Sequence, residues 1–221
     1  SALLIVIYLI YNRVQDYQTV LPTNLFKNRN YAASSTGLFL GNLAIMGPMI
    51  IFPLFFQNFK GFNTIEAAIA LMPQGIGMLL ARPMIGKLTD QYGAKKVIFV
   101  SLILSIVASI PFIFVNGNTS IIILSMLLLL RGISVGGILL PFTTNTYADL
   151  KDDQLPQAGI TINIVENIGS SFGSALIATV VATISIHNHI MAFHIGFLVP
   201  AIVFILLLVC WAMIPSKSMK V

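Results

Sequence analysis

Arg131 and Glu166 are the side chains of this sequence whose type and surroundings suggest chemistry, because both lie inside long apolar runs. A charge at the centre of a membrane-spanning helix costs about 2.5 to 3.5 kcal/mol even on the mildest insertion scale, so each needs a physical reason to be there. Arg131 lies ten residues after Ile121 and Glu166 nine residues after Gln157, where their respective runs start. At 1.5 Å per residue both are about 14 to 15 Å deep, which puts the two opposite charges in a position to pair.

Two interpretations of this pair remain open. In one, it is a structural salt bridge. In the other, Glu166 is a proton carrier that loads and unloads as the helices move. Polar side chains also recur at spacings of three and four around Glu166, which places them on one helix face, and we expect that face to line a cavity. The candidate residues for proton coupling or for the cavity are Arg131, Asn163, Glu166 and Asn167.

The elements that position these residues follow from composition. Of the 221 residues, 57% are hydrophobic and 9% are charged, against roughly 25% charged in a soluble domain, so the solvent is a lipid bilayer. A spanning helix needs about 20 apolar residues, and six runs meet this length. They cover residues 33–57, 64–86, 97–115, 121–143, 158–186 and 192–214. The sequence therefore predicts an all-α membrane protein with a bundle of six transmembrane helices.

The ends of the chain predict further segments. Residues 1–11 are apolar but too few to cross a bilayer, so we interpret them as the end of a truncated transmembrane helix. Residues 12–32 form a polar connector, residues 33–214 the six-helix bundle, and residues 215–221 a tail. On this interpretation the chain is the C-terminal part of a longer protein.

The orientation follows from Lys and Arg, which gather in alternate loops. Those loops, and so the connector and the C-terminal tail, are predicted to be cytoplasmic, in a multi-pass protein of the cell membrane. The net charge of +5 then reports topology and gives no reason to expect a nucleic-acid partner. The opposite side holds only Lys60. The predicted cytoplasmic cations are Arg13, Lys27, Arg29, Lys87, Lys95, Lys96, Lys151, Lys217 and Lys220.

The six predicted helices are not alike. The runs 97–115 and 192–214 are apolar all round, apart from His194 near one end, and are expected to face lipid. The other four carry the remaining polar side chains and are expected to face surroundings other than lipid. They also carry glycines four residues apart, which lets neighbouring helices approach closely. These pairs are Gly37/Gly41, Gly132/Gly136 and Gly169/Gly173.

The segment GKLTDQYGAKK, residues 86–96, places four charged side chains between two apolar runs. In the simplest interpretation it is a positively charged hairpin. In the other, it is a loop with a breakable polar latch in which Gly86 and Gly93 allow the turn. Asp90 would accept backbone N–H groups at a helix start or pair with a cation, while Lys95 and Lys96 anchor the inner face.

Several of these patterns resemble those of one family. The 86–96 segment is similar to the cytoplasmic loop signature of the major facilitator superfamily, which joins the second and third helices of a six-helix repeat, and it falls in that place here. A second match reads Leu127-x-x-x-Arg131-Gly132-x-x-x-Gly136-Gly137. Further fragments are Pro53-Leu54-x-x-Gln57 with Gly61, Met72-Pro73-x-Gly75, Asn163-x5-Gly169-x3-Gly173 and Leu25-Phe26-x-Asn28-Arg29. Together they resemble the second half of the fourteen-helix drug:proton antiporters, the EmrB- and QacA-type multidrug exporters.

The resemblance implies proton-coupled export of amphipathic compounds by alternating access. Cationic compounds are one option within this class. It implies four partners, namely the substrate, protons, the bilayer and a missing N-terminal half, without which this chain is not expected to transport. The implied conformational gate comprises Gly86, Asp90, Gly93, Lys95 and Lys96. One departure concerns Glu166-Asn167, which stands where related exporters often have Arg-Gln, so the family's behaviour there does not carry over.

Other classes of function have weaker support. No glycine-rich phosphate loop ending in Lys-Ser or Lys-Thr is present, which argues against an ATP-driven pump within this chain. His187, His189 and His194 are interpreted as interface histidines rather than as a metal site. We therefore predict no enzyme activity, no metal and no cofactor. The alternatives left open are uptake or facilitated diffusion of a small metabolite on the same fold and, less favoured, a non-transporting membrane scaffold or sensor.

Overall fold

A computed structural model describes residues 23–185 and 189–214, and every element in this part of the chain is helical. Six of its segments are long and apolar enough to cross a membrane, which confirms the predicted number of spans. The predictions for residues 1–11, 215–221 and most of 12–32, and for His187, lie outside the described residues. The α-helices are α2 Arg29–Met46, α3 Pro48–Lys60, α4 Thr64–Tyr92, α5 Ala94–Ser109, α6 Ile121–Tyr147, α7 Leu155–Ser185 and α8 His189–Met213. Short 3-10 helices are η1 Thr23–Lys27, η2 Ile110–Phe114 and η3 Asp152–Gln154.

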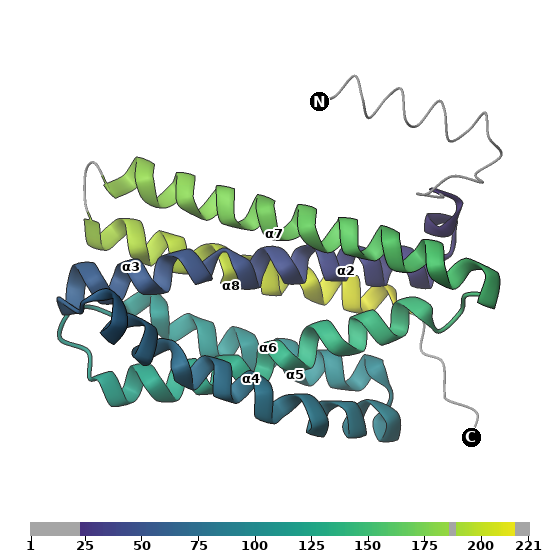
Figure 1. The fold of residues 1–221 in the computed structure, drawn as a ribbon, viewed down its shortest axis with the longest axis horizontal. Helices are drawn as coiled ribbons and strands as arrows, with labels where there is room; N and C mark the ends of the chain where they lie inside the picture. Colours follow the sequence, from purple (N-terminus) through teal and green to yellow (C-terminus); the bar gives the residue numbers. More distant parts are fainter. Residues whose placement is uncertain (1–22, 186–188, 215–221) are drawn as a thin grey trace.

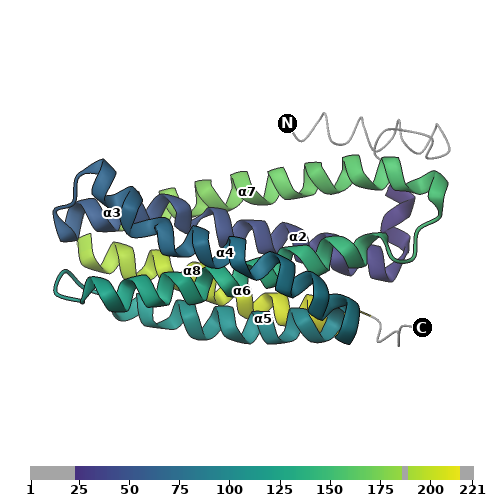
Figure 2. The ribbon, with the colours of Figure 1, turned by 60° about the horizontal axis from the view of Figure 1, so that its bottom comes forward.

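The helices form two groups that pack against each other. One group contains α4, α5 and α6, and the other contains α7, α8 and the first span, in which α2 and α3 run end to end (Figure 1). Within the groups α2 contacts α7 and α8, and α6 contacts α4 and α5, while the contact of α2 with α6 joins the two groups. The same arrangement is visible after rotation (Figure 2). Because α2 and α6 have neighbours on most sides, they form the centre of the bundle.

Several helices begin where a polar side chain can accept the free N–H groups of the first turn. Asn28 Oδ1 accepts the N–H groups of Asn30 and Tyr31 at the start of α2. Asn63 caps α4 in the same way, and the side chain of Glu66 accepts the N–H of Asn63 in return. Glu66 is thus an exposed capping residue at the start of a helix.

The predicted glycine pairs bring helices into direct backbone contact. A Cβ on Gly132 of α6 would collide with the carbonyl of Gln74 on α4, and one on Gly169 of α7 would collide with the carbonyl of Phe39 on α2. Gly173 meets the backbone of Leu43 in the same way. The sequence prediction that these glycines permit close helix approach is confirmed at these positions. The centre of the bundle therefore depends on backbone contacts that no larger residue allows.

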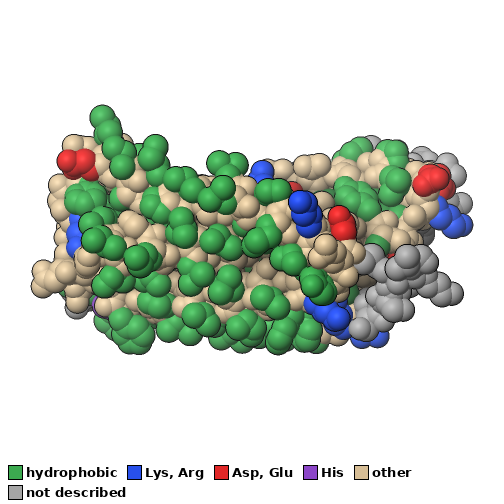
Figure 3. Space-filling view, turned by 90° about the horizontal axis from the view of Figure 1, so that it is seen from below, with side chains coloured by type: hydrophobic (Ala, Val, Ile, Leu, Met, Phe, Trp, Pro, Cys, Tyr) green, Lys and Arg blue, Asp and Glu red, His purple; other side chains and the backbone are tan. Residues whose placement is uncertain are grey.

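The most open helices are α4 and α7. In their most apolar 18-residue windows 22% of residues are buried, against 44% in α5 and in α8. Their exposed faces carry Arg82 on α4 and Asn163 and Asn167 on α7, although polar side chains within a span require polar surroundings. Figure 3 shows the side of the molecule on which α4 lies, and hydrophobic side chains cover most of it, with a few charged ones among them. The open faces of α4 and α7 are therefore largely apolar, with a few polar or charged side chains set among large hydrophobic ones.

The contact between α4 and α6 gives a direct test of this packing. We expect Gly132→Ala to destabilise the protein by about 1 to 3 kcal/mol, because the added methyl group has only the rigid backbone of Gln74 to displace. Gly136→Ala, one turn later on α6, is the matched control, since a Cβ there meets Ala81 at an ordinary 3.5 Å. The midpoint of thermal unfolding in detergent measures both. Equal midpoints for the two variants would contradict this account.

Candidate functional site

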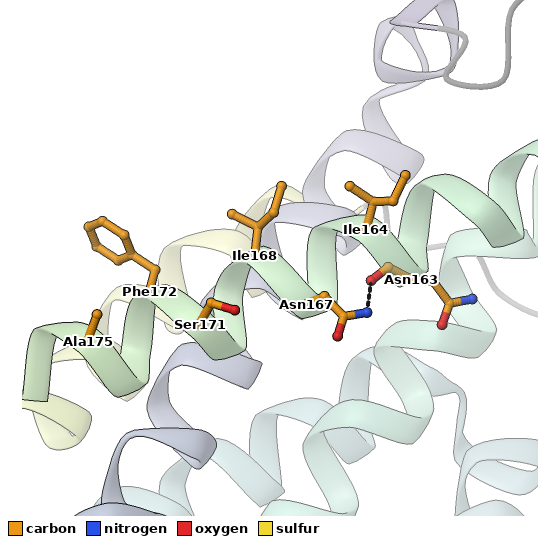
Figure 4. Close-up of a pocket in the computed structure, with 7 residues that line it drawn as sticks. All are labelled: Asn163, Ile164, Asn167, Ile168, Ser171, Phe172 and Ala175. Carbon is orange, nitrogen blue, oxygen red and sulfur yellow. Dashed lines mark hydrogen bonds between the residues drawn. The ribbon is translucent and has the colours of Figure 1, made fainter. Parts of the chain in front are cut away.

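A shallow, widely open depression lies along the exposed flank of α7. All of its lining residues come from α7, so its opposite wall is not supplied by the described part of the chain. Figure 4 shows two rows of side chains on this helix. The polar row contains Asn163, Asn167 and Ser171, and the apolar row contains Ile164, Ile168 and Phe172, with Ala175 at the end of the hollow. We call this surface the α7 hollow.

The polar row is supported by hydrogen bonds within its own helix. The side-chain amide of Asn163 donates to the carbonyl of Gly159 at 3.0 Å, and that of Asn167 donates to the carbonyl of Asn163 at 2.7 Å (Figure 4). Such bonds to the preceding turn satisfy amide donors without a partner from another helix. The sequence prediction of a polar face on this helix is consistent with these positions. Its role in transport remains a prediction.

Glu166 lies half-buried beside the α7 hollow. Its carboxyl group interacts electrostatically with Tyr147 at the end of α6, and the Tyr147 hydroxyl is 3.4 Å from where a Cβ on Gly159 would lie. The Ser170 hydroxyl, one turn after Glu166, donates to the Glu166 carbonyl at 2.8 Å and makes a long contact of 3.5 Å with Asn42 of α2. Sequence reasoning missed Tyr147, because a single tyrosine at a helix end has no distinctive spacing.

Arg131 does not pair with Glu166, so the predicted ion pair is wrong. Its side chain is 1% exposed, its Nη2 donates to the carbonyl of Ala44 on α2 at 3.2 Å, and its Cζ lies 5.2 Å from the ring centre of Phe52 on α3. Its Nη1 has no hydrogen-bond partner among residues 23–185 and 189–214. Arg131 therefore belongs to the interior of the bundle and not to the α7 hollow.

The reason for this error is the position of α2. Consecutive helices α6 and α7 pack on α2, which lies between them. The depths also differ, because Arg131 lies 16 residues before the end of α6 and Glu166 lies 11 residues after the start of α7, or about 24 Å and about 16 Å from those ends. Chain order and depth alone did not decide which side chains meet.

The 86–96 segment is mostly helix, whereas the sequence predicted a loop. The last turns of α4 include Gly86 and Asp90, and the turn to α5 occurs only at Gly93, whose φ of 84° favours glycine. Asp90 is therefore exposed near the C-terminal end of a helix, so the predicted option of a helix start is wrong, and its pairing with a cation stays a prediction. A carboxylate is electrostatically disfavoured at that end, so Asp90 does not stabilise α4.

The two lysines of this segment have different environments. Lys95 donates to the carbonyl of Ile214 at 2.6 Å and lies 5.4 Å from the ring centre of Trp211, while the indole N–H of Trp211 donates to the carbonyl of Lys95 at 2.7 Å. Phe99 also packs on the Trp211 ring, with ring centres 4.6 Å apart. Lys96 is exposed. Lys95 thus joins the start of α5 to the end of α8, a contact that no spacing in the sequence indicates.

At the opposite end of the bundle, the side chains of Lys60 and His194 bind backbone carbonyls of one loop. Lys60, at the end of α3, donates to the carbonyl of Gly117 at 2.7 Å and to that of Thr119. A ring nitrogen of His194 lies 2.9 Å from the carbonyl of Val115. His194 therefore contacts backbone, and its interpretation as an interface histidine stays a prediction. These contacts fix the connection between η2 and α6.

Residues 3–174 match the family model described as Major Facilitator Superfamily. Similar curated proteins include "Multidrug resistance protein B homolog" of Mycobacterium tuberculosis (strain ATCC 25618 / H37Rv), which is 23% identical over 78% of this chain and 32% of its own length. "Probable multidrug resistance protein EmrY" of Escherichia coli (strain K12) is 27% identical over 72% of this chain and 31% of its own length.

A third similar protein carries a different name. "Riboflavin transporter RibZ" of Clostridioides difficile (strain 630) is 21% identical over 88% of this chain and 42% of its own length. The chain spans about a third of the length of the two multidrug resistance relatives and 42% of this one.

The contacts of Lys95 predict different effects for two adjacent lysines. We expect Lys95→Ala to lower stability by about 1 to 2 kcal/mol, since it removes a charged hydrogen bond and a cation–π contact at a partly exposed site. Lys96→Ala, which removes the same charge from an exposed position, is expected to change stability by less than about 0.5 kcal/mol. Thermal unfolding in detergent measures both variants, and a similar loss in each would attribute the effect to net charge alone.

Proposed function

The chain belongs to the Major Facilitator Superfamily, a family of membrane transporters and not of enzymes, and on this premise we propose that it forms the C-terminal six-helix half of a proton-coupled exporter. The substrate is a drug or another small amphipathic compound. It moves out across the cytoplasmic membrane by alternating access, in exchange for protons. The proposed N-terminal half supplies the second wall of the α7 hollow.

The observation that carries this proposal is the half-buried carboxyl group of Glu166 beside the α7 hollow. The apolar row of the hollow suits the hydrophobic part of an amphipathic compound, and the row containing Asn163 and Asn167 suits its polar part. Two of the relatives are also named as multidrug resistance proteins. An ionised Glu166 attracts a cationic substrate, which favours cations within this class.

The proposed exchange requires Glu166 to carry one proton per cycle. In the outward-open state the carboxylate takes up a proton, which removes its negative charge and weakens its hold on a cationic substrate. In the inward-open state it releases that proton to the cytoplasm and again attracts substrate. Binding thus differs between the two states, as any ligand-driven change of conformation requires. Arg131 takes no part in this step, because α2 separates it from α7.

The proposed gate is at the end of the bundle where α4 meets α5. Asp90 and Lys96 are exposed there and are available to the N-terminal half in one access state. Gly86 and Gly93 are the small residues of the segment, and Lys95 holds its start against α8. We propose that Asp90 forms a charged contact with the N-terminal half and that this contact breaks when the gate opens.

The similarity to a riboflavin transporter favours a second candidate, uptake or facilitated diffusion of a small metabolite. Substrate-dependent proton release from vesicles containing the full-length protein separates the candidates. If the protein exchanges substrate for protons, an amphipathic cation added on one side of the vesicle membrane should displace protons from the binding sites that face that side. Metabolite uptake instead predicts that riboflavin-like compounds accumulate without proton release. A non-transporting scaffold or sensor predicts neither result.

We expect Glu166→Gln in the full-length protein to lower proton-coupled efflux about tenfold or more, equivalent to about 1.4 kcal/mol in the transport barrier. The amide keeps the size of the carboxyl group but carries no exchangeable charge. Glu66→Gln is the matched control, because Glu66 caps α4 at its exposed end and an amide oxygen can accept the same hydrogen bond. Efflux and proton flux in proteoliposomes measure both variants. Unchanged efflux and proton flux in Glu166→Gln would make the residue structural.

A further inference from the structure

The first span contains a break in its hydrogen-bond ladder at Gly47 and Pro48. In an α-helix the N–H of residue 48 would bond to the carbonyl of residue 44, but proline has no N–H and its ring crowds that carbonyl. The neighbouring bonds are also altered, since the N–H of Gly47 is 3.4 Å from the carbonyl of Leu43 and that of Ile50 bonds to the carbonyl of Gly47. The carbonyl of Ala44 therefore lacks its helical donor inside an apolar bundle.

Arg131 supplies a donor to this carbonyl from another helix. Its Nη2 bonds to the Ala44 oxygen at 3.2 Å, on the α2 side of the break, and its guanidinium lies 5.2 Å from the Phe52 ring centre, on the α3 side. The side chain is 1% exposed, and its Nη1 is unpaired within the described chain. One buried cation thus contacts both parts of the interrupted span.

The other side of the break is held by α7. A Cβ on Gly47 would lie 3.0 Å from the carbonyl oxygen of Gly173 and would also collide with Ile177. The break is therefore enclosed by α6 through Arg131 and by α7 through its glycine face. The angle between the axes of α2 and α3 at this break is called the bend, and a change in it requires Arg131 to release or to exchange one of its contacts.

We propose that Arg131 is a positioning residue that sets the bend between α2 and α3 by holding the Ala44 carbonyl, which Pro48 leaves free, together with the Phe52 ring. This role differs from proton transfer. It follows from the contacts of this bundle, and only its effect on transport rests on the function proposed above. It predicts that Arg131 and Pro48 act as one unit, because the arginine is needed only where the proline removes the helical donor.

A double-mutant cycle tests this unit in the full-length protein. The single variants are Pro48→Ala, which returns an N–H to the Ala44 carbonyl, and Arg131→Met, which removes the donor but keeps an unbranched chain. We expect Arg131→Met to lower the efflux rate about tenfold in the presence of Pro48 and only about twofold together with Pro48→Ala. Pro83→Ala, at an exposed helix-interior proline of α4, is the control for proline removal and is expected to leave the effect of Arg131→Met unchanged.

A second readout does not depend on transport. Spin labels at Thr36→Cys on α2 and Asn58→Cys on α3, both exposed positions, report the bend in a background carrying Cys210→Ala. We expect Arg131→Met to shift or broaden the distance between the labels, Pro48→Ala to lengthen it, and the double variant to match Pro48→Ala. These distances test the bend even if the protein does not export drugs.

The outcomes separate the proposal from ordinary structural importance. If Arg131→Met fails to fold and Pro48→Ala restores folding, the proposal is supported. Equal effects of Arg131→Met with and without Pro48→Ala, in folding yield, label distance or efflux rate, would overturn it. An unchanged label distance in Arg131→Met would overturn it as well. Loss of efflux in Glu166→Gln has no bearing on either result.

Discussion

The Ala44 carbonyl loses its helical donor at Pro48 and lies where water is not available to replace it. In an apolar medium an unsatisfied backbone group is costly, so the protein must supply a donor of its own. Here the donor is the buried guanidinium of Arg131, which is itself tolerated because the carbonyl and the Phe52 ring both face it. This mutual requirement ties α6 to the first span at the centre of the bundle.

The remaining packing is arranged around that centre. Glycines on α6 meet the backbone of α4, and glycines on α7 meet the backbone of α2. The two groups of helices join where α2 packs on α6. As a consequence α4 and α7 keep broad open faces. Asn163 and Asn167 of α7 lie on such a face, and their side-chain amides donate to carbonyls of the same helix. A binding site formed there needs a second wall from outside the six helices, which accords with the proposal of a missing half.

The charged segment between α4 and α5 combines two roles within a few residues. Lys95 is directed to α8 and holds the bundle together, whereas Asp90 and Lys96 are exposed. The residues of this segment, which resembles a family signature, therefore have different roles. Its inward residue stabilises the six-helix unit, and its outward residues are the ones available to another part of a transporter.

The sequence by itself determined the solvent, the helical class, the six spans and the glycines that let helices touch, because a bilayer imposes strict limits on hydrophobicity, length and backbone hydrogen bonding. It also placed Asn163 and Asn167 on one face of their helix, since 3.6 residues make one turn. Only the tertiary structure decided which helices are neighbours and how each is rotated. That is why α2, lying between α6 and α7, separates Arg131 from Glu166, and why Lys95 meets Trp211, far away in the chain. Such contacts depend on side-chain packing across helices, which spacing within one helix does not encode.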